Sequence, residues 1–508
     1  MISPLHQTAL DMPETIAIQQ TDNGDKASIK HSDAVSYLKL SALVTNLVTS
    51  LKKQGVSHNS RLACISLNNL EMICLYWACV DLGAIFLPIS PKFPVSQQAQ
   101  LCQRFKIDFY WSEAQQSDFN ISDGTQQRLK IDLQLERKHP DPIQSKPSID
   151  SKKPLNIILT SGSSGTPKGV VHCLSNHIAS AQGSAENISL KSGDTWLLSL
   201  PLFHIGGLAI INRCTLAGAC VVLSNNQPLW QQISDNEISH VSLVAAQLSK
   251  ILAQHPQALD QVKALLLGGG AIEAKLVSAL ADRHINAYCS YGMSEMSSQI
   301  TTALINPQGH LGKPLSHRQM EIRDGTIWVK GDCLFLGYLT DAVTDNTVPS
   351  HQQCIAEKVT DEQGWFNTQD LGELDDSDNL RLLGRADNMF ICGGENIHPE
   401  EIEAALKAHP LIENALVFAE EDKTFSLLPA AIIQLKNSEL SSQQTATVPV
   451  EAQLSTAQVN SIEQFIIERI ARFKRPRHYY SWPTGIKTTS LKIPRKAIIA
   501  AVKQRLPL

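Results

Sequence analysis

The sequence has little net charge and no long apolar segment free of charges. Its formal net charge is -5 over 508 residues, and it has no basic patch of the kind that dominates nucleic-acid affinity. The most apolar long stretch, 70–89, contains Glu71 and Asp81 and breaks at Gly83, which indicates a buried helix followed by a strand. We therefore expect small-molecule ligands, no nucleic-acid partner and no membrane span.

The eleven cysteines include no C-x-x-C pair. Their number is odd, and most of them, such as Cys64, Cys74 and Cys214, lie in apolar runs like small core residues. Disulfides and structural zinc are therefore not expected. The opening residues 1–6 lack a basic region followed by an apolar core, so we expect no secretory signal and a cytoplasmic protein.

Helical periodicity alternates with short apolar runs from about residue 36, which predicts a layered α/β body. We expect helices at 37–53, 70–82, 247–254 and 273–283. We expect extended segments at 62–67, 86–89, 155–159, 196–200, 219–223, 240–244, 264–267 and 287–290.

The pattern changes near residue 311 to short strands, at 319–322, 326–329 and 380–383. A compact unit follows residue 387, with a helix expected at 399–408 because Pro-Glu-Glu suits a helix N-terminus. We predict an α/β fold with a large multi-subdomain N-terminal domain, 1–386, and a smaller mobile α+β C-terminal domain, 387–508. Residues 436–457 are rich in Ser, Gln and Thr and are expected to be a loose insertion.

Residues 160–169 read Thr-Ser-Gly-Ser-Ser-Gly-Thr-Pro-Lys-Gly and follow an apolar run. Glycines let the backbone approach an anion, hydroxyls donate to phosphate oxygens, and a lysine adds a positive charge. A solvated Gly/Ser linker is the alternative, although linkers seldom end in Pro-Lys-Gly followed by apolar residues. The segment predicts a phosphate-binding loop, with ATP as the expected nucleotide. Its candidate residues are Thr160, Ser161, Gly162, Ser163, Ser164, Gly165, Thr166 and Lys168.

This loop is not of the Walker type. Counted from Gly162, that motif needs glycine where Pro167 stands and serine or threonine where Gly169 stands. The common NTPase fold is therefore disfavoured.

Seven further segments accompany the loop in a fixed order. They are Pro201–Gly207, Leu267–Ala271, Tyr291–Glu295, Gly364–Gly372, Gly384–Asp387, Gly393–Pro399 and Ile486–Arg495. Together with the loop they resemble the acyl-adenylate-forming superfamily of acyl- and aryl-CoA synthetases, luciferases and peptide-synthetase adenylation domains. The resemblance covers residues 36–500. It implies an AMP-forming acid–thiol ligase that uses ATP, Mg²⁺ and coenzyme A.

Two segments narrow this resemblance. Residues 198–204 followed by Arg213, and residues 391–402, are similar to the o-succinylbenzoate:CoA ligases of menaquinone biosynthesis, although ligases for halobenzoates share the second segment. A CoA ligase for another aryl or fatty acid remains an alternative. So do an adenylation domain acting on a carrier protein in trans and a non-catalytic ATP-binding signalling module. The sequence leaves open whether the protein forms a homo-oligomer.

The resemblance also implies nucleotide contacts outside the loop. Glu295 is expected to bind Mg²⁺, since magnesium beside polyphosphate uses one carboxylate and phosphate oxygens. Asp370 is expected to bind the ribose hydroxyls, with Arg385 near ribose and phosphate. Taken alone, these three are ordinary surface charges. The remaining candidates, around adenine and phosphate, are Gly269, Gly270, Tyr291, Gly292, Met293 and Ser294.

Lys492 aligns with the catalytic lysine of the superfamily. A substrate carboxylate must attack the α-phosphate although both are anions, and a cation aimed at the reacting centre offsets their repulsion. A solvated basic tail is the ordinary alternative. Asp387 aligns with the hinge between two orientations of the small domain, and Gly393 and Gly394 with the channel for the pantetheine arm of CoA.

Arg213 interrupts an apolar segment that begins after His204. An arginine there either reaches the surface along its aliphatic stem or forms a planar fork for an anion. A dicarboxylate substrate has one carboxylate that is not activated and needs such a partner. Our candidates for the acid pocket are His204, Arg213, Ser242 and Gln299. His204 is expected to gate access to the pocket or to be a buried structural histidine.

Overall fold

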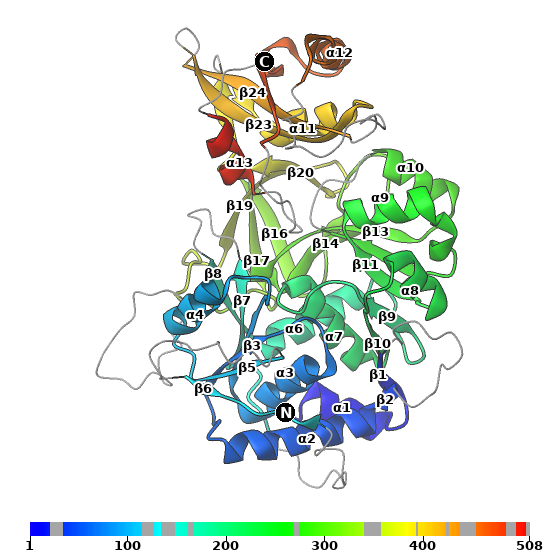
Figure 1. Cartoon of the computed structure of the whole chain (residues 1–508), viewed down its shortest axis with the longest axis vertical. Helices are drawn as coiled ribbons and strands as arrows, with labels where there is room; N and C mark the ends of the chain where they lie inside the picture. Colours follow the sequence, from blue (N-terminus) through cyan, green and yellow to red (C-terminus); the bar gives the residue numbers. More distant parts are fainter. Residues whose placement is uncertain are drawn as a thin grey trace, which may run out of the picture. The chain divides into compact units, whose positions relative to one another are not determined.

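The computed structural model describes residues 1–20, 34–113, 126–133, 148–160, 167–268, 274–339, 357–392, 395–422, 426–436, 454–483 and 494–503 (Figure 1). Several sequence predictions lie outside these residues. They concern residues 437–453 of the expected insertion and Ser161, Gly162, Ser163, Ser164, Gly165, Thr166, Gly269, Gly270, Gly393, Gly394 and Lys492.

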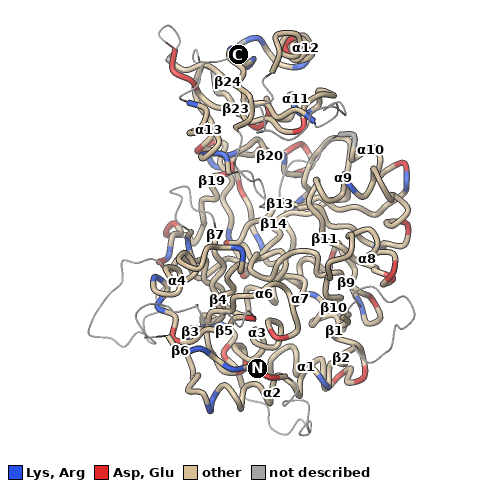
Figure 2. The backbone as a smooth tube through the Cα atoms, in the orientation of Figure 1, with Lys and Arg blue, Asp and Glu red and all other residues tan. Residues whose placement is uncertain are grey.

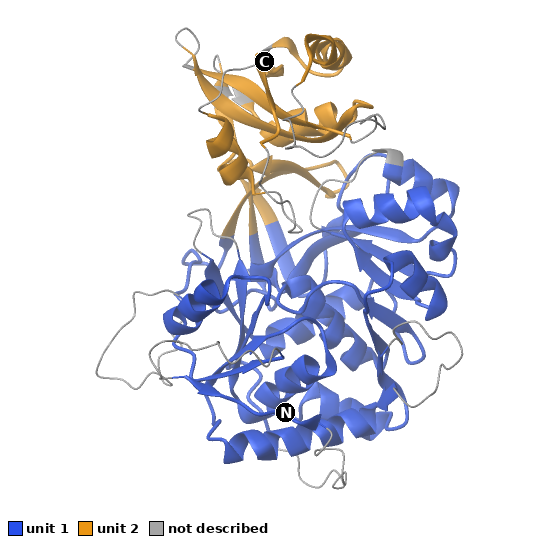
Figure 3. Ribbon diagram, viewed as in Figure 1, with its two compact units in different colours: residues 1–268, 276–320, 329–366 blue, residues 269–275, 321–328, 367–508 orange. Residues whose placement is uncertain are grey.

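The chain divides into two compact units (Figure 3). Unit 1 comprises Met1–Gly268, Leu276–Met320 and Val329–Phe366, and unit 2 comprises Gly269–Lys275, Glu321–Trp328 and Asn367–Leu508. The main part of unit 2 thus begins before residue 386. The predicted domain boundary at 386 therefore does not coincide with the division between the compact units, and it stays a prediction.

Unit 1 contains a nine-stranded sheet among its described residues, in the order β15-β14-β13-β12-β11-β9-β10-β1-β2. The six strands from β13 to β1 in that order are all parallel, so their carboxyl ends share one edge. The strands are β1 (Ile16–Gln20), β2 (Ala34–Ser36), β9 (Thr195–Leu198), β10 (Cys220–Leu223), β11 (His240–Leu243), β12 (Ala264–Leu267), β13 (Ala287–Met293), β14 (Ser298–Leu304) and β15 (Lys313–Pro314).

A seven-stranded sheet, also in the described part of unit 1, has the order β18-β8-β7-β4-β3-β5-β6. Strands β7 and β8 are antiparallel, with Thr160 opposite Lys168. The two ends of the predicted phosphate loop are therefore held together as a hairpin. The strands are β3 (Arg61–Ile65), β4 (Ile85–Ile89), β5 (Phe109–Ser112), β6 (Gln127–Arg128), β7 (Pro154–Thr160), β8 (Lys168–Cys173) and β18 (Gly337–Leu339).

The helices around these sheets follow the predicted periodicity where it is strong. Helix α3 has the expected limits: the Asn69 side chain accepts a hydrogen bond from the Met72 amide at its start, and Gly83 ends it with a φ of 66°. It is buried almost throughout, as its charge-poor sequence predicts. The helices are α1 (Pro4–Asp11), α2 (Tyr37–Lys53), α3 (Leu70–Leu82), α4 (Val95–Arg104), α6 (Leu174–Ala185), α7 (Ile205–Ala217), α8 (Leu229–Asp235), α9 (Ala245–Gln254) and α10 (Ala274–Asp282), with short 3₁₀ turns η2 (Pro256–Leu259) and η3 (Ser294–Met296).

The division between the units falls within a four-stranded sheet, β16-β17-β19-β20, formed by β16 (Arg318–Arg323), β17 (Thr326–Gly331), β19 (Phe366–Leu374) and β20 (Leu380–Arg385). The rest of unit 2 packs Ile402 and Leu406 of its first helix against Val417 and Ile462. Its elements are β21 (Phe390–Cys392), β22 (Glu395–Ile397), α11 (Pro399–Lys407), β23 (Ile412–Asp422), β24 (Ser426–Leu435), α12 (Thr456–Ile467), η5 (Arg472–Lys474), β25 (His478–Ser481) and α13 (Arg495–Val502).

The predicted α/β class, with a large N-terminal and a smaller C-terminal domain, is confirmed. The ten cysteines in the described part of the chain are free and buried, as expected. None of the described helices combines the length and hydrophobicity that crossing a bilayer requires. Basic and acidic residues are interspersed along the chain (Figure 2). The sequence did not predict β8, because only two apolar residues, Val170 and Val171, separate its Lys-Gly start from His172.

Gly169 has a packing role in the structure. A Cβ atom there would lie 2.8 Å from the Phe105 ring and 2.9 Å from Cγ2 of Ile157. The missing side chain therefore lets β8 pack closely against two core side chains, and the expected approach of the backbone to an anion stays a prediction.

Candidate active site

Three predicted site residues of unit 1 are connected through Tyr338, which no sequence motif indicated. They are Thr160, Lys168 and Glu295. Glu295 lies in turn η3 and is only 8% exposed, and its Oε1 accepts a hydrogen bond of 2.7 Å from the Tyr338 hydroxyl. The Lys168 ammonium lies 4.9 Å from the centre of the Tyr338 ring. Since Thr160 pairs with Lys168, Tyr338 brings both ends of the phosphate loop close to the predicted magnesium ligand.

The turn that carries Ser294 and Glu295 has an unusual backbone. Ser297 and Ser298 follow it with φ angles of 52° and 112°, in a region that non-glycine residues avoid. At Gly292, just before the turn, a Cβ atom would lie 2.1 Å from the Ser298 carbonyl oxygen, so only glycine fits. Gly292 therefore has a packing role in the structure, and its contact with a nucleotide stays a prediction.

The residues around Glu295 fit a magnesium ion held jointly with a polyphosphate. Among the described residues there is no group of three or more His, Cys, Asp or Glu side chains that could bind a metal alone. Magnesium typically takes one or two carboxylates, waters and substrate phosphates. A single buried carboxylate beside the start and end of a phosphate loop meets that requirement only when the phosphates are present.

Arg213 and Gln299, two candidates for the acid pocket, are in direct contact. Arg213 Nη2 donates to Gln299 Oε1 at 2.7 Å and to Ser298 Oγ at 3.3 Å, and its guanidinium lies 5.4 Å from the centre of the Trp196 ring. The indole Nε1 of Trp196 donates to Ser242 Oγ at 3.2 Å. The structure thus links Arg213 to Ser242 through Trp196, a residue that no sequence motif indicated, and Gln299 joins this group through Arg213.

Arg213 is a buried cation without a carboxylate partner in the described part of the chain. Its Nε is buried and makes no hydrogen bond there. Burial, together with the nearby charge of Arg318, lowers the pKa of Arg213 to about 10. Arg318 is itself buried, and its Nε donates to the Gln299 carbonyl oxygen at 2.5 Å. Two buried guanidinium groups therefore share Gln299, an arrangement that an anionic ligand would stabilise.

His204 lies toward the opposite end of helix α7 from Arg213. It is the exposed residue that precedes α7, and its ring contacts Phe203 edge to face at 4.9 Å. Nine residues of helix, about 13 Å, separate it from Arg213. The alternative of a buried structural histidine is therefore wrong, whereas a role in access to the pocket stays a prediction.

The predicted ribose residues lie together in unit 2. Asp370 and Arg385 are opposite each other on β19 and β20, and Arg385 Nη1 donates to Asp370 Oδ1 at 3.0 Å. Arg385 Nε donates to Oδ1 of Asp387, the predicted hinge residue, at 3.1 Å. Burial lowers the pKa of Arg385, but the charges of Asp370 and Asp387 have the larger combined effect, so the pKa of the guanidinium is raised. The three residues thus form one charge cluster, although their contacts with a nucleotide stay predictions.

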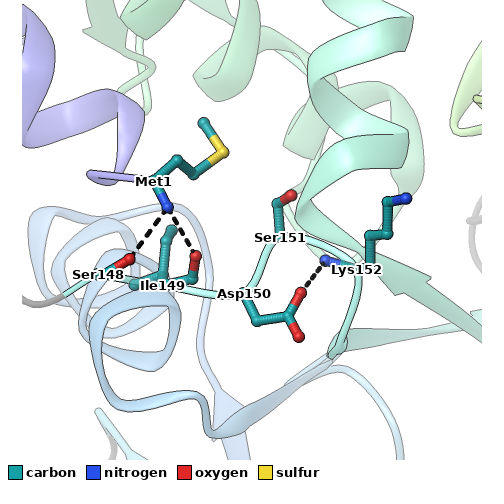
Figure 4. A pocket seen from close by; sticks show the side chains of 6 residues that line it. All are labelled: Met1, Ser148, Ile149, Asp150, Ser151 and Lys152. Atoms are coloured by element: carbon teal, nitrogen blue, oxygen red, sulfur yellow. Dashed lines mark hydrogen bonds between the residues drawn. The ribbon is translucent and has the colours of Figure 1, made fainter.

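The other nucleotide candidates of unit 1 lie at the end of β13. The Tyr291 side chain is buried, whereas Met293 and Ser294 are partly exposed. A pocket lined by Met1, Ser148, Ile149, Asp150, Ser151 and Lys152 contains none of the candidate residues (Figure 4). The N-terminal ammonium donates there to Ser148 Oγ and to the Ile149 carbonyl oxygen, which makes it a local surface contact.

Residues 7–339 match the model of a family described as AMP-binding enzyme. The chain therefore belongs to the AMP-binding enzyme family. Among curated proteins it is 30% identical to the 2-succinylbenzoate–CoA ligase of Haemophilus influenzae, over 94% of this chain and 96% of the relative. It is 28% identical to the protein of that name from Escherichia coli, over 96% and 95%.

The similar solved structures include enzymes of the same kind as these curated relatives. The chain matches o-succinylbenzoate CoA synthetase from Bacillus subtilis in complex with the acyl-adenylate intermediate OSB-AMP, with a TM-score of 0.79, 26% identity and coverage of 98% and 97% of the two chains. It matches the same enzyme in complex with ATP and magnesium ion with a TM-score of 0.79, 26% identity and coverage of 98% and 99%.

Proposed function

We propose that the chain is an ATP-dependent ligase that converts 2-succinylbenzoate to 2-succinylbenzoyl-CoA through an acyl-AMP intermediate, as in menaquinone biosynthesis. The observation that carries this proposal is buried Arg213, whose Nε has no partner among the described residues and which lies beside Gln299 and a second buried arginine. A dianionic acid supplies the missing counter-charge with the carboxylate that does not react. The names of the relatives support the same substrate.

The proposed reaction has two steps. An oxygen of the substrate carboxylate attacks the α-phosphorus of ATP, the bond to the β-phosphate oxygen breaks, and pyrophosphate leaves. The thiol of CoA then attacks the acyl carbon, loses its proton and displaces AMP to give the thioester. Lys492 stabilises the charge of the first transition state, and Asp370 and Arg385 hold the ribose.

Glu295 is the residue that would hold magnesium, and the bound ion would neutralise phosphate charge. Thr160 and Lys168 bind the phosphates from the two ends of the loop. We further propose that Asp387 is the hinge for rotation of the C-terminal domain, and that Gly393 and Gly394 line the CoA channel. The proposed partners are the acid, MgATP and CoA, and because the cytoplasm supplies the last two we place the enzyme there.

Pyrophosphate exchange over a panel of acids tests the proposal. We expect 2-succinylbenzoate to drive incorporation of labelled pyrophosphate into ATP, with benzoate and medium-chain fatty acids at least about 100-fold less effective per unit concentration because they leave Arg213 unpaired. Efficient exchange with a monocarboxylate would assign a different acid. Binding of ATP without exchange for any acid would favour a non-catalytic module.

Replacement of Tyr338 by phenylalanine tests how Glu295 is held. The variant keeps the ring next to Lys168 and removes the hydroxyl that donates to the Glu295 carboxylate. Hydrogen bonds to charged groups contribute about 1.5–3 kcal/mol, so we expect the KM for MgATP to rise about tenfold or more while the KM for the acid changes little. Steady-state kinetics with each substrate varied in turn measure both. An unchanged KM for MgATP would show that the hydroxyl does not position Glu295.

A further inference from the structure

A chain of three buried side chains leads from helix α6 to the turn that carries Glu295. His177 Nε2 lies 2.7 Å from Asn156 Oδ1, Asn156 Nδ2 lies 3.3 Å from His172 Nδ1, and His172 Nε2 lies 2.6 Å from the Ser294 carbonyl oxygen. All three side chains are at most 1% exposed. Asn156 is on β7 and His172 on β8, the two strands that end and begin at the phosphate loop.

The carbonyl oxygen at one end of this chain fixes the position of each proton. The Ser294 oxygen can only accept, so His172 Nε2 carries the hydrogen, and Nδ1 of the neutral ring accepts from the Asn156 amide. The Asn156 oxygen then accepts from His177 Nε2. Burial lowers the pKa of His172 to about 4 and that of His177 well below its usual value, which keeps both rings neutral at physiological pH. The three hydrogen bonds therefore all run in one direction, from His177 through Asn156 and His172 to the Ser294 carbonyl oxygen in the turn.

Three main-chain carbonyl oxygens in and just after the turn accept hydrogen bonds from donors outside it. Beside the His172 contact at Ser294, the Glu295 carbonyl oxygen accepts from the Phe335 amide at 2.8 Å, and the Ser297 carbonyl oxygen accepts from Ser180 Oγ at 2.6 Å. The positive φ angles of the two serines that follow cost about 1–3 kcal/mol each and persist only where the surroundings impose them. The side-chain donors therefore hold Ser294 and Glu295 in a backbone conformation that the local sequence does not favour.

We propose that His172 is a positioning residue for MgATP, an inference that rests on the function proposed above. Thr160 lies four residues after Asn156 on β7, and Lys168 lies four residues before His172 on β8. The hydrogen bond from His172 to Ser294 thus fixes the turn with the Glu295 carboxylate relative to the two strands whose ends carry the phosphate contacts. His172 touches neither the nucleotide nor the metal and acts through the Ser294 carbonyl.

Two substitutions of His172 separate this role from simple packing. His172→Phe fills the site without a donor, whereas His172→Gln keeps an N–H group that can reach the Ser294 oxygen. Calorimetric titration with MgATP measures binding without reference to the acid. We expect the phenylalanine variant to bind MgATP at least about tenfold more weakly and the glutamine variant to stay within about threefold of the wild type. The KM for the acid should change less than twofold in both.

The matched control is His6→Ala. His6 is also a buried ring of unit 1, with bonds of 2.8 Å to Ser41 Oγ and 2.6 Å to Asp81 Oδ2, and none of these residues belongs to the candidate site. We expect this variant to melt at a lower temperature and to keep its affinity for MgATP. Equal MgATP affinities for His172→Phe and His172→Gln would overturn the proposal, as would a loss of affinity in His6→Ala equal to that of His172→Phe.

The binding and exchange experiments together distinguish a failure of the inference about His172 from a failure of the proposed function. If the wild type binds MgATP but no acid drives pyrophosphate exchange, the ligase assignment fails while the binding data still decide the role of His172. If exchange occurs and the two His172 variants bind MgATP alike, the ligase assignment stands and the inference fails.

Discussion

Lys492→Ala is expected to abolish acid-dependent pyrophosphate release while leaving thioester formation from supplied acyl-AMP within a few-fold of the wild type. Only the first step brings two anions together, and unit charges 4 Å apart repel by about 4 kcal/mol at an effective dielectric constant of about 20. Loss of a cation that offsets this repulsion corresponds to about a 1,000-fold lower rate. Single-turnover measurements of each half-reaction separate the two steps.

The chain supplies a matched control for the loss of charge. Lys503→Ala removes an exposed lysine at the end of α13 in the same unit, and we expect both half-reactions to be unchanged. Arg495, three residues after Lys492 in the sequence, donates to the Glu403 carboxylate and to the Val417 carbonyl oxygen. Equal losses of both half-reactions in Lys492→Ala would contradict the assignment of this lysine to the first step.

The elements that sequence predicted best are those whose signals are local. Helix α3 has an N-cap asparagine, a run of apolar residues on all faces and a terminal glycine, and its observed limits are the predicted ones. Strand β12 was likewise predicted at its observed limits, because four consecutive apolar residues lie between turn residues. The phosphate loop was predicted from the same kind of local signal, since its glycines and hydroxyls lie close together in the sequence, and it stays a prediction.

The contacts that organise the site could not be predicted, because they join residues far apart in the sequence. The Tyr338–Glu295, Arg213–Gln299 and His172–Ser294 bonds span 43, 86 and 122 residues. Each of these hydrogen bonds depends on the order of strands in a sheet. One sequence does not determine that order where parallel and antiparallel connections are both present. Nothing local distinguishes these partners from ordinary core or surface side chains.

Arg318 illustrates this limit most clearly. In the sequence it is one charge in a short polar strand, where a solvated position is the normal expectation. In the structure it is buried, and it donates to the carbonyl oxygens of Gln299 and Ser316 and to Ser180. Only the packing of β16 against α6 and β14 shows that a second cation lies close to Arg213.

Arg213→Ala is expected to raise the KM for 2-succinylbenzoate by about 30- to 1,000-fold and to leave the KM for MgATP nearly unchanged. Removing one partner of a buried, hydrogen-bonded charge pair costs about 2–4 kcal/mol, and each 1.4 kcal/mol corresponds to about a tenfold change in affinity. Arg213→Met is the control for size, since it fills the same space without charge and should behave like the alanine variant. Arg213→Lys keeps the charge but loses the planar fork, so we expect an intermediate KM.

The same three variants show whether the arginine recognises the carboxylate that does not react. With an analogue of 2-succinylbenzoate esterified at that carboxyl group, the wild type itself should bind weakly, because the Arg213 guanidinium would be covered by a group without charge. Arg213→Met should then discriminate far less between acid and ester than the wild type does. If the wild type used acid and ester equally well, or if Arg213→Ala left the KM for the acid unchanged, the arginine would not be part of the acid pocket. In that case the substrate assignment would lose the observation that supports it most.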